Sequence, residues 1–134
     1  MNTRREFLMG SLAATAALAI ASPAPARASY FPFAGIIYTS DSAGMWAGKV
    51  EAHMPKVERK GDVVSIATNH PMSAEHFIVR HTLVLADGTV AGSRTFQPSD
   101  AKAVSTIELP ATYTSKFYVT SFCNKHDFWV TEVD

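Results

Sequence analysis

The strongest chemical signal in the sequence is the segment Cys123-Asn124-Lys125-His126, which contains the only cysteine of the 134-residue chain. Two intervening residues allow a sulfur and an imidazole nitrogen to bind one metal ion from a single turn. The same turn can aim backbone N–H groups at the sulfur, and such hydrogen bonds tune the potential of a bound metal. A lone buried cysteine can also be purely structural. The segment therefore indicates a metal site, with a packed thiol as the alternative.

Three more histidines lie in segments that could bring their rings to the same ion. His70 and His76 bracket a short loop, and the proline that follows His70 holds it in an extended conformation. His53 also stands just before a segment that proline keeps extended. The remaining histidine, His81, falls on the apolar face of a predicted strand, which indicates a packed residue or a subunit contact.

The kinds of donor atom restrict the choice of metal. Four imidazoles and one thiolate make five ligands, one more than a structural zinc site normally takes. Blue copper sites use two histidines, one cysteine and usually a methionine, but no methionine follows Cys123 in this chain. Mixed histidine and thiolate ligation suits iron, because a thiolate pushes electron density toward an oxygen species bound opposite it. The residues favour a single non-haem iron, with zinc or copper as the alternatives.

The elements that must position these residues are predicted to be short β-strands. Runs rich in β-branched and aromatic residues are separated by turn residues, and no stretch after residue 28 keeps a helical period. Residues 30–50 lack clean alternation, which indicates an arm and loop that pack on the domain or on another subunit. We predict an all-β fold, an immunoglobulin-like antiparallel β-sandwich of about seven strands. The strands identified are residues 62–67, 76–85, 90–96, 103–109, 113–122 and 128–133.

Residues 1–28 have the pattern of a twin-arginine signal peptide. Arg4-Arg5 precede an alanine-rich apolar stretch, and Ala26-Arg27-Ala28 has the small residues that a signal peptidase requires. The apolar stretch is short for a membrane span. We expect export to the periplasm, no membrane attachment after cleavage, and one mature domain at residues 29–134. This route exports folded proteins that often carry a cofactor, which agrees with a metal site.

The composition excludes several other classes of function. The formal net charge is zero at pH 7, so nothing indicates a nucleic-acid partner. The hydrophobic fraction of 47% is ordinary for a globular domain. A single cysteine excludes both an internal disulfide and a second iron centre held by four cysteines.

Three segments in order resemble the iron-binding domain of the superoxide reductase family, which includes neelaredoxin and desulfoferrodoxin. They are residues 51–55 (EAHMP), 70–78 (HPMSAEHFI) and 122–129 (FCNKHDFW). The resemblance implies a one-iron member that transfers an electron from ferrous iron to superoxide and releases hydrogen peroxide. It also implies a square-pyramidal iron with a vacant position for superoxide opposite an axial cysteine. The implied ligands are the axial Cys123, His126 through Nδ1, and His53, His70 and His76 through Nε2.

The resemblance also implies roles for residues around the iron. Glu51 matches the carboxylate that binds the ferric iron after turnover. The lysine that usually follows this glutamate is Ala52 here, and Lys125 or Lys49 could partly replace its charge. We therefore expect Lys125→Ala to slow the reaction with superoxide at low salt. The missing lysine also leaves an alternative, in which the same iron site serves electron transfer or small-ligand binding.

The partners that follow from this resemblance are superoxide and an electron donor in the periplasm. The sequence does not identify the donor. The resemblance and the aromatic segment near residue 30 indicate a homo-oligomer, either a dimer or a tetramer.

Overall fold

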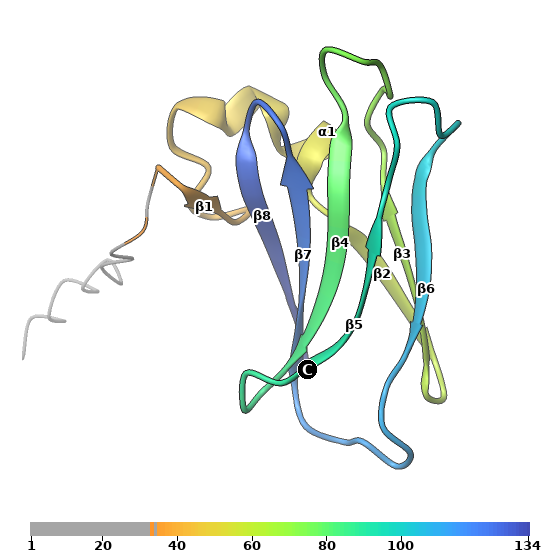
Figure 1. The fold of residues 1–134 in the computed structure, drawn as a ribbon. Helices are drawn as coiled ribbons and strands as arrows, with labels where there is room; N and C mark the ends of the chain where they lie inside the picture. The colour runs from red at the N-terminus through yellow and green to blue at the C-terminus, as the bar shows by residue number, and fades with distance from the viewer. Residues whose placement is uncertain (1–32, 34) are drawn as a thin grey trace, which may run out of the picture. The chain divides into compact units, whose positions relative to one another are not determined.

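The computed structural model describes Phe33 and residues 35–134, which form two β-sheets packed as a sandwich (Figure 1). The larger sheet has the strand order β1-β8-β7-β4-β5, and the smaller has the order β2-β3-β6. The predicted all-β, immunoglobulin-like sandwich is confirmed. The predicted signal peptide, residues 1–28, lies outside the described residues.

Eight strands and two short helical segments make up the described part of the chain. The strands are β1 (Ile37–Tyr38), β2 (Lys56–Lys60), β3 (Val63–Thr68), β4 (Ile78–Leu85), β5 (Val90–Thr95), β6 (Ala103–Glu108), β7 (Phe117–Cys123) and β8 (Asp127–Val133). A 3-10 helix, η1 (Gly44–Lys49), leads directly into one α-helical turn, α1 (Val50–His53). Neither helix is long and apolar enough to cross a bilayer, nor is any other helix in the described residues.

All six strands identified in the sequence are present, although their ends differ by a few residues. Two elements differ from the prediction. Residues 44–53 are helical where a loop was predicted, because η1 and α1 are too short to display a helical period. Strand β2 was not predicted, because it contains one apolar residue, Val57, among four charged ones. Such a charged strand suits the sheet edge that β2 occupies.

The strand pairings are antiparallel except at one edge of the larger sheet. There the two-residue strand β1 runs parallel to β8, with Ile37 opposite Phe128 and Tyr38 opposite Trp129. This pairing brings the segment before η1 onto the sandwich. The prediction of an antiparallel sheet therefore holds for every long strand.

Alternate residues of the strands face the interior, as the two-residue period of a β-strand requires. Most of the buried apolar residues form two groups between the sheets. The large core cluster contains Val64, Ile66, Leu83, Leu85, Ile107, Leu109, Phe117 and Val119. The small core cluster contains Ile78, Phe96, Ala103 and Cys123.

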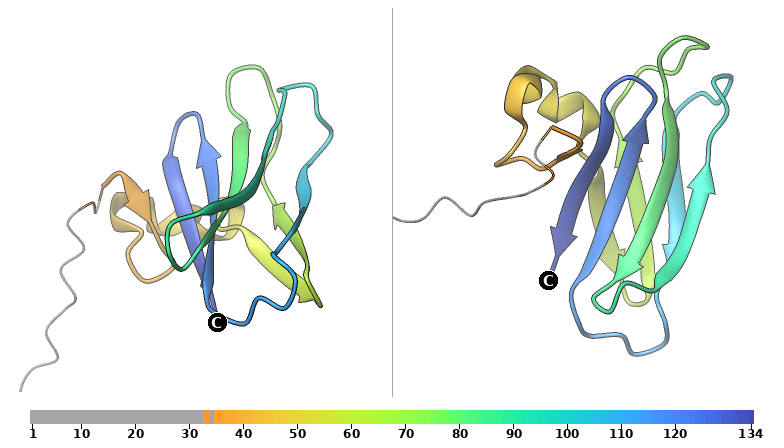
Figure 2. Two further views of the ribbon diagram at one scale, coloured as in Figure 1. Left: turned by 60° about the horizontal axis from the view of Figure 1, so that its bottom comes forward. Right: turned by 60° about the vertical axis from the view of Figure 1, so that its left-hand side comes forward.

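The small core cluster marks the end of the sandwich where several connections meet. Ile78, the first residue of β4, pairs with Cys123, the last residue of β7. The β3–β4 loop, the β7–β8 turn and α1 all lie at this end, and the C-terminus lies at the other (Figures 1 and 2). Each histidine singled out as a ligand belongs to one of these three connections, and Cys123 ends β7 where the β7–β8 turn begins.

Candidate metal centre

The five predicted ligands place their donor atoms close together at this end of the sandwich. His53, His70, His76 and Cys123 each offer one donor atom, and these atoms all lie within 4.8 Å of one another. The fifth residue, His126, places Nδ1 3.0 Å from His53 Nε2 and 3.2 Å from His76 Nε2. The same Nδ1 lies 3.6 Å from Cys123 Sγ. Four imidazoles and one thiol thus meet at one point.

Backbone carbonyls fix the tautomers of two of these histidines. Nδ1–H of His53 donates to the carbonyl oxygen of Lys49 at 2.9 Å, and Nδ1–H of His70 donates to that of Pro71. A neutral ring protonated at Nδ1 has its lone pair on Nε2. The unprotonated Nε2 of His70 lies 3.1 Å from His76 Nε2, and that of His53 lies 3.0 Å from His126 Nδ1. Imidazole lone pairs aimed at a shared point beside a thiol are a donor set that fits a metal ion.

Burial keeps the imidazoles neutral and ready to bind a metal. The His53 ring is buried, and this desolvation lowers its pKa to about 4. Burial is also the main cause that lowers the pKa values of His70, His76 and His126. At neutral pH the lowered pKa values leave each ring uncharged, with one nitrogen free to bind a metal.

The Cys123 thiol is fully buried, and this burial is the main cause that raises its pKa. Backbone N–H groups of Lys125 and His126 oppose the rise by donating to the sulfur. They are the N–H groups expected from the Cys-x-x-His turn, and they would stabilise a thiolate bound to a metal. A metal bound here would displace the thiol proton, because the thiolate is the form that binds.

Asn124 holds the β7–β8 turn against the loop that carries His76. Its side-chain oxygen accepts from the backbone N–H of Phe77 at 3.0 Å, and its NH₂ group donates to the carbonyl of Glu75 at 3.0 Å. The turn itself closes at Asp127, whose φ of 55° lies in the left-handed region that Asp tolerates. Sequence reasoning did not identify Asn124 as a functional residue. Its position between Cys123 and Lys125 was the only available signal.

Two tryptophans form the wall of the centre. Trp129 is fully buried, donates its indole N–H to the carbonyl of His126 at 3.0 Å, and lies 5.3 Å from the His53 ring, centroid to centroid. Trp46 of η1 meets the His126 ring edge-on at 4.6 Å. The segment predicted as an irregular arm therefore covers one side of the site.

The two residues predicted to be catalytic lie outside the converging donor atoms. Glu51 is exposed on α1, where its carboxylate pairs with the ammonium group of Lys56. Lys125 is exposed on the β7–β8 turn, and its charge contributes to the lowered pKa values of His76 and His126. The charge of Lys49 acts in the same way on His70, His76 and His126. Both lysines therefore project positive potential onto the centre.

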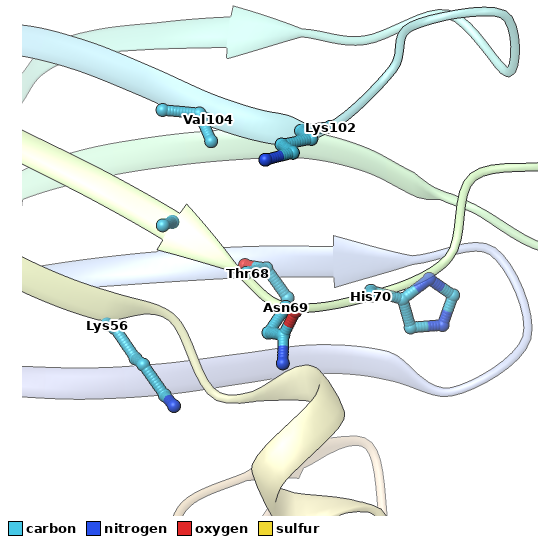
Figure 3. Close-up of a pocket in the computed structure, with 7 residues that line it drawn as sticks. Lys56, Thr68, Asn69, His70, Lys102 and Val104 are labelled. Atoms are coloured by element: carbon cyan, nitrogen blue, oxygen red, sulfur yellow. The ribbon is translucent and has the colours of Figure 1, made fainter.

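An open pocket of about 280 Å³ lies next to the centre on the side of the smaller sheet. Figure 3 shows the His70 ring to one side of it, with Lys56, Asn69 and Lys102 around the remainder. His70 is the one member of the ligand group that lines this pocket.

Comparison with known proteins identifies the family of this site. Residues 45–132, which include all five converging residues, match the family model described as Desulfoferrodoxin. The chain belongs to the desulfoferrodoxin family. A comparison of this family member with curated proteins gives no match.

Solved structures with the same fold come from several organisms. Two are variants of the superoxide reductase (neelaredoxin) from Ignicoccus hospitalis, 27% and 30% identical to this desulfoferrodoxin-family chain, with TM-scores of 0.66 and 0.62. The first match covers 78% of this chain and 96% of the other, and the second covers 72% and 90%. The superoxide reductase from Treponema pallidum is 28% identical, with a TM-score of 0.53 over 63% of this chain and 67% of its own.

Proposed function

We propose that this protein reduces superoxide to hydrogen peroxide at one iron ion held by the four converging histidines and Cys123. The observation that carries the proposal is the meeting of four neutral imidazoles and one thiol at a single buried point. The similar solved proteins named as superoxide reductases support the same reaction. Iron bound there would supply the single electron that superoxide takes up, together with two protons from solvent, to give hydrogen peroxide.

The residues of the chain prepare the site for an anionic substrate. Burial holds the imidazoles neutral, because it lowers their pKa values more than the carbonyl hydrogen bonds of His53 and His70 raise them. The ligand set therefore adds one negative charge, that of the Cys123 thiolate. Lys49 and Lys125 add positive potential, which raises the local concentration of an anion such as superoxide. Their charge partly replaces that of the lysine which the resemblance implies at the position of Ala52.

Glu51 is proposed to bind the oxidised iron after turnover, and its present partner does not prevent this. Its carboxylate pairs with Lys56, and the two side chains are 79% and 58% exposed. An exposed ion pair contributes little free energy, so the carboxylate can exchange between partners.

We expect Lys49→Ala and Lys125→Ala each to lower the second-order rate constant for superoxide by up to about tenfold at low ionic strength. The decrease should shrink as salt is added, because ions screen exposed charges. Pulse radiolysis of the reduced protein at several salt concentrations measures both effects. Lys60→Ala is the matched control, since Lys60 lies at the opposite end of β2 and pairs with Glu58. Equal rate constants for all three variants and the native chain would contradict the steering role.

The second candidate function is electron transfer or small-ligand binding at the same iron site. Ala52, in place of the usual cation, is the observation that favours it. Adding superoxide to the reduced protein separates the two functions. Superoxide reduction requires one hydrogen peroxide formed and one iron oxidised for each superoxide consumed. A reduced protein that is oxidised by partner proteins but reacts slowly with superoxide would identify the second function.

We also propose that residues 1–28 direct export to the periplasm by the twin-arginine route, and that the mature domain forms a homo-oligomer supplied with electrons by a periplasmic donor. The Arg4-Arg5 pair and the cleavage pattern at residues 26–28 support export. Cell fractionation with N-terminal sequencing tests this part of the proposal. A full-length chain retained in the cytoplasm would disprove it. The mass of the purified protein in solution decides the oligomeric state.

A further inference from the structure

A layer of polar side chains crosses the core of the sandwich between its two apolar clusters. It consists of Thr68 on β3, His81 on β4, Ser105 on β6 and Ser121 on β7, all buried. Two of them belong to the smaller sheet and two to the larger. Four adjacent polar residues in a sandwich core need an explanation, because apolar residues would fill the same space without the cost of desolvation.

The four side chains form one continuous chain of hydrogen bonds. Thr68 Oγ1 lies 2.9 Å from His81 Nε2 and 2.8 Å from Ser121 Oγ, and His81 Nδ1 lies 2.8 Å from Ser105 Oγ. Burial, with a smaller contribution from Arg94, lowers the pKa of His81 to about 4. The neutral ring therefore has one donor and one acceptor nitrogen, and each of them meets a hydroxyl group. No buried side-chain nitrogen or oxygen in the described residues lacks a partner.

The layer lies next to the candidate metal centre along β3 and β7. Thr68 and Ser121 each stand two residues before a ligand, His70 and Cys123 respectively. The carbonyl of Thr68 accepts the backbone N–H of His70 at 2.9 Å, which turns the chain sharply at the end of β3. In β7, Ser121 and Cys123 face the same side of the strand. Thr68, which bonds both His81 and Ser121, is the hub of the network. Its carbonyl is bonded to the ligand His70, and its hydroxyl reaches β7, the strand that carries Cys123.

The network also joins the two sheets that supply the ligands. His70 follows β3 of the smaller sheet, whereas Cys123 ends β7 of the larger sheet. Apolar contacts hold two sheets together but specify their relative offset weakly, since many arrangements bury similar areas. Hydrogen bonds specify that offset, because buried donors and acceptors are costly when they lose their partners.

From this geometry we infer that His81 and Thr68 are positioning residues, which fix the smaller sheet against the larger one and thereby set His70 opposite Cys123. The part of this inference that concerns metal binding rests on the proposed function. The fixed offset of the sheets is a property of the chain without metal. Labelling of the metal-free chain therefore tests the sheet offset, and metal titration tests its consequence for binding.

Thr68→Val and Thr68→Ser form the matched pair of variants. Valine has nearly the shape of threonine but removes the hydroxyl at the hub, whereas serine keeps the hydroxyl. In the reduced, metal-free chain, the one cysteine allows its labelling by a thiol reagent to be followed at a single site. We expect Thr68→Val to speed labelling of Cys123 beyond the rate that global unfolding, measured with urea, accounts for. Thr68→Ser should label at nearly the native rate.

The same variants are then titrated with Co²⁺, whose thiolate absorption band reports binding at Cys123. We expect roughly a tenfold weaker affinity for Thr68→Val and almost no change for Thr68→Ser. Leu83→Ala is the control. Leu83 lies on the same face of β4 as His81, but it packs in the large core cluster and makes no bond of the network. Leu83→Ala should destabilise the fold, yet its labelling should follow global unfolding and its Co²⁺ affinity should stay close to native.

Each outcome decides one part of the inference. Equal labelling in the valine and serine variants would overturn the positioning role, whatever the metal does. If Thr68→Val does not fold, Ser121→Ala removes one bond of the hub and is judged by the same two readouts. A native chain that fails to bind Co²⁺ would count against the proposed function, and the labelling result would still decide the role of the network.

Discussion

Cys123→Ser is expected to lower the affinity for iron by at least about 100-fold and to remove the thiolate-to-iron absorption band of the oxidised protein. Loss of a group that only supports a ligand typically weakens metal binding about 10- to 100-fold, and loss of the ligand itself should cost more. The substituted oxygen is a poor ligand for iron in this setting, because a serine hydroxyl does not ionise near neutral pH. The four imidazoles would remain, so any residual binding reports their contribution.

The sandwich should still fold, because serine differs from cysteine by one atom. Cys123 is packed in the small core cluster, and the hydroxyl that replaces its thiol remains within reach of the N–H groups of Lys125 and His126. Iron content and the visible spectrum after reconstitution measure the loss. Met72→Leu is the control, since Met72 packs against the same cluster and its replacement should preserve both iron and spectrum. If Cys123→Ser keeps the absorption band, the sulfur is not a ligand.

The sequence predicts the strands whose apolar residues alternate clearly. Strands β3, β6 and β7 bury every second residue, so their period is visible without the structure. In β4 the alternation is broken, because a bulge between Ile78 and Arg80 turns Ile78 inward beside Cys123. A bulge is set by pairing with a neighbouring strand, and the residues of one strand do not reveal it.

The candidate ligands could be named from the sequence, because three segments in order resemble the motifs of one family. Their surroundings could not be predicted in this way, because they depend on residues distant in the chain. The Glu51–Lys56 pair and the contacts of Asn124 arise only when separate loops meet. The hydrogen-bond partners of His81 lie on two other strands, β3 and β6, and Thr68 extends the network to Ser121 on β7. The place of His81 on an apolar face therefore did not reveal the network.

Trp129→Ala is expected to lower the free energy of unfolding of the metal-free protein by about 3–5 kcal/mol, the usual cost of removing a fully buried aromatic side chain. Trp129 packs with Tyr38 and Ala43 in a cluster that also contacts Trp46 and Met54. Its ring thus joins η1 and the segment after α1 to the larger sheet. Deleting it leaves a cavity bordered by Tyr38, Ala43 and the His53 ring, and the lost contacts and the cavity together set the cost.

Trp129→Phe separates the hydrogen bond from the packing. Phenylalanine keeps most of the apolar contact but leaves the carbonyl of His126 without its indole donor, which should cost about 1–3 kcal/mol. Urea unfolding of the metal-free variants measures both losses, with Phe128→Ala as the control, because Phe128 is 40% exposed on the opposite face of β8. A loss for Trp129→Ala no larger than that for Phe128→Ala would contradict the assignment. Because Trp129 contacts both the His53 ring and the carbonyl of His126, the same variants should also weaken metal binding, which would show that the site depends on this wall as well as on its ligands.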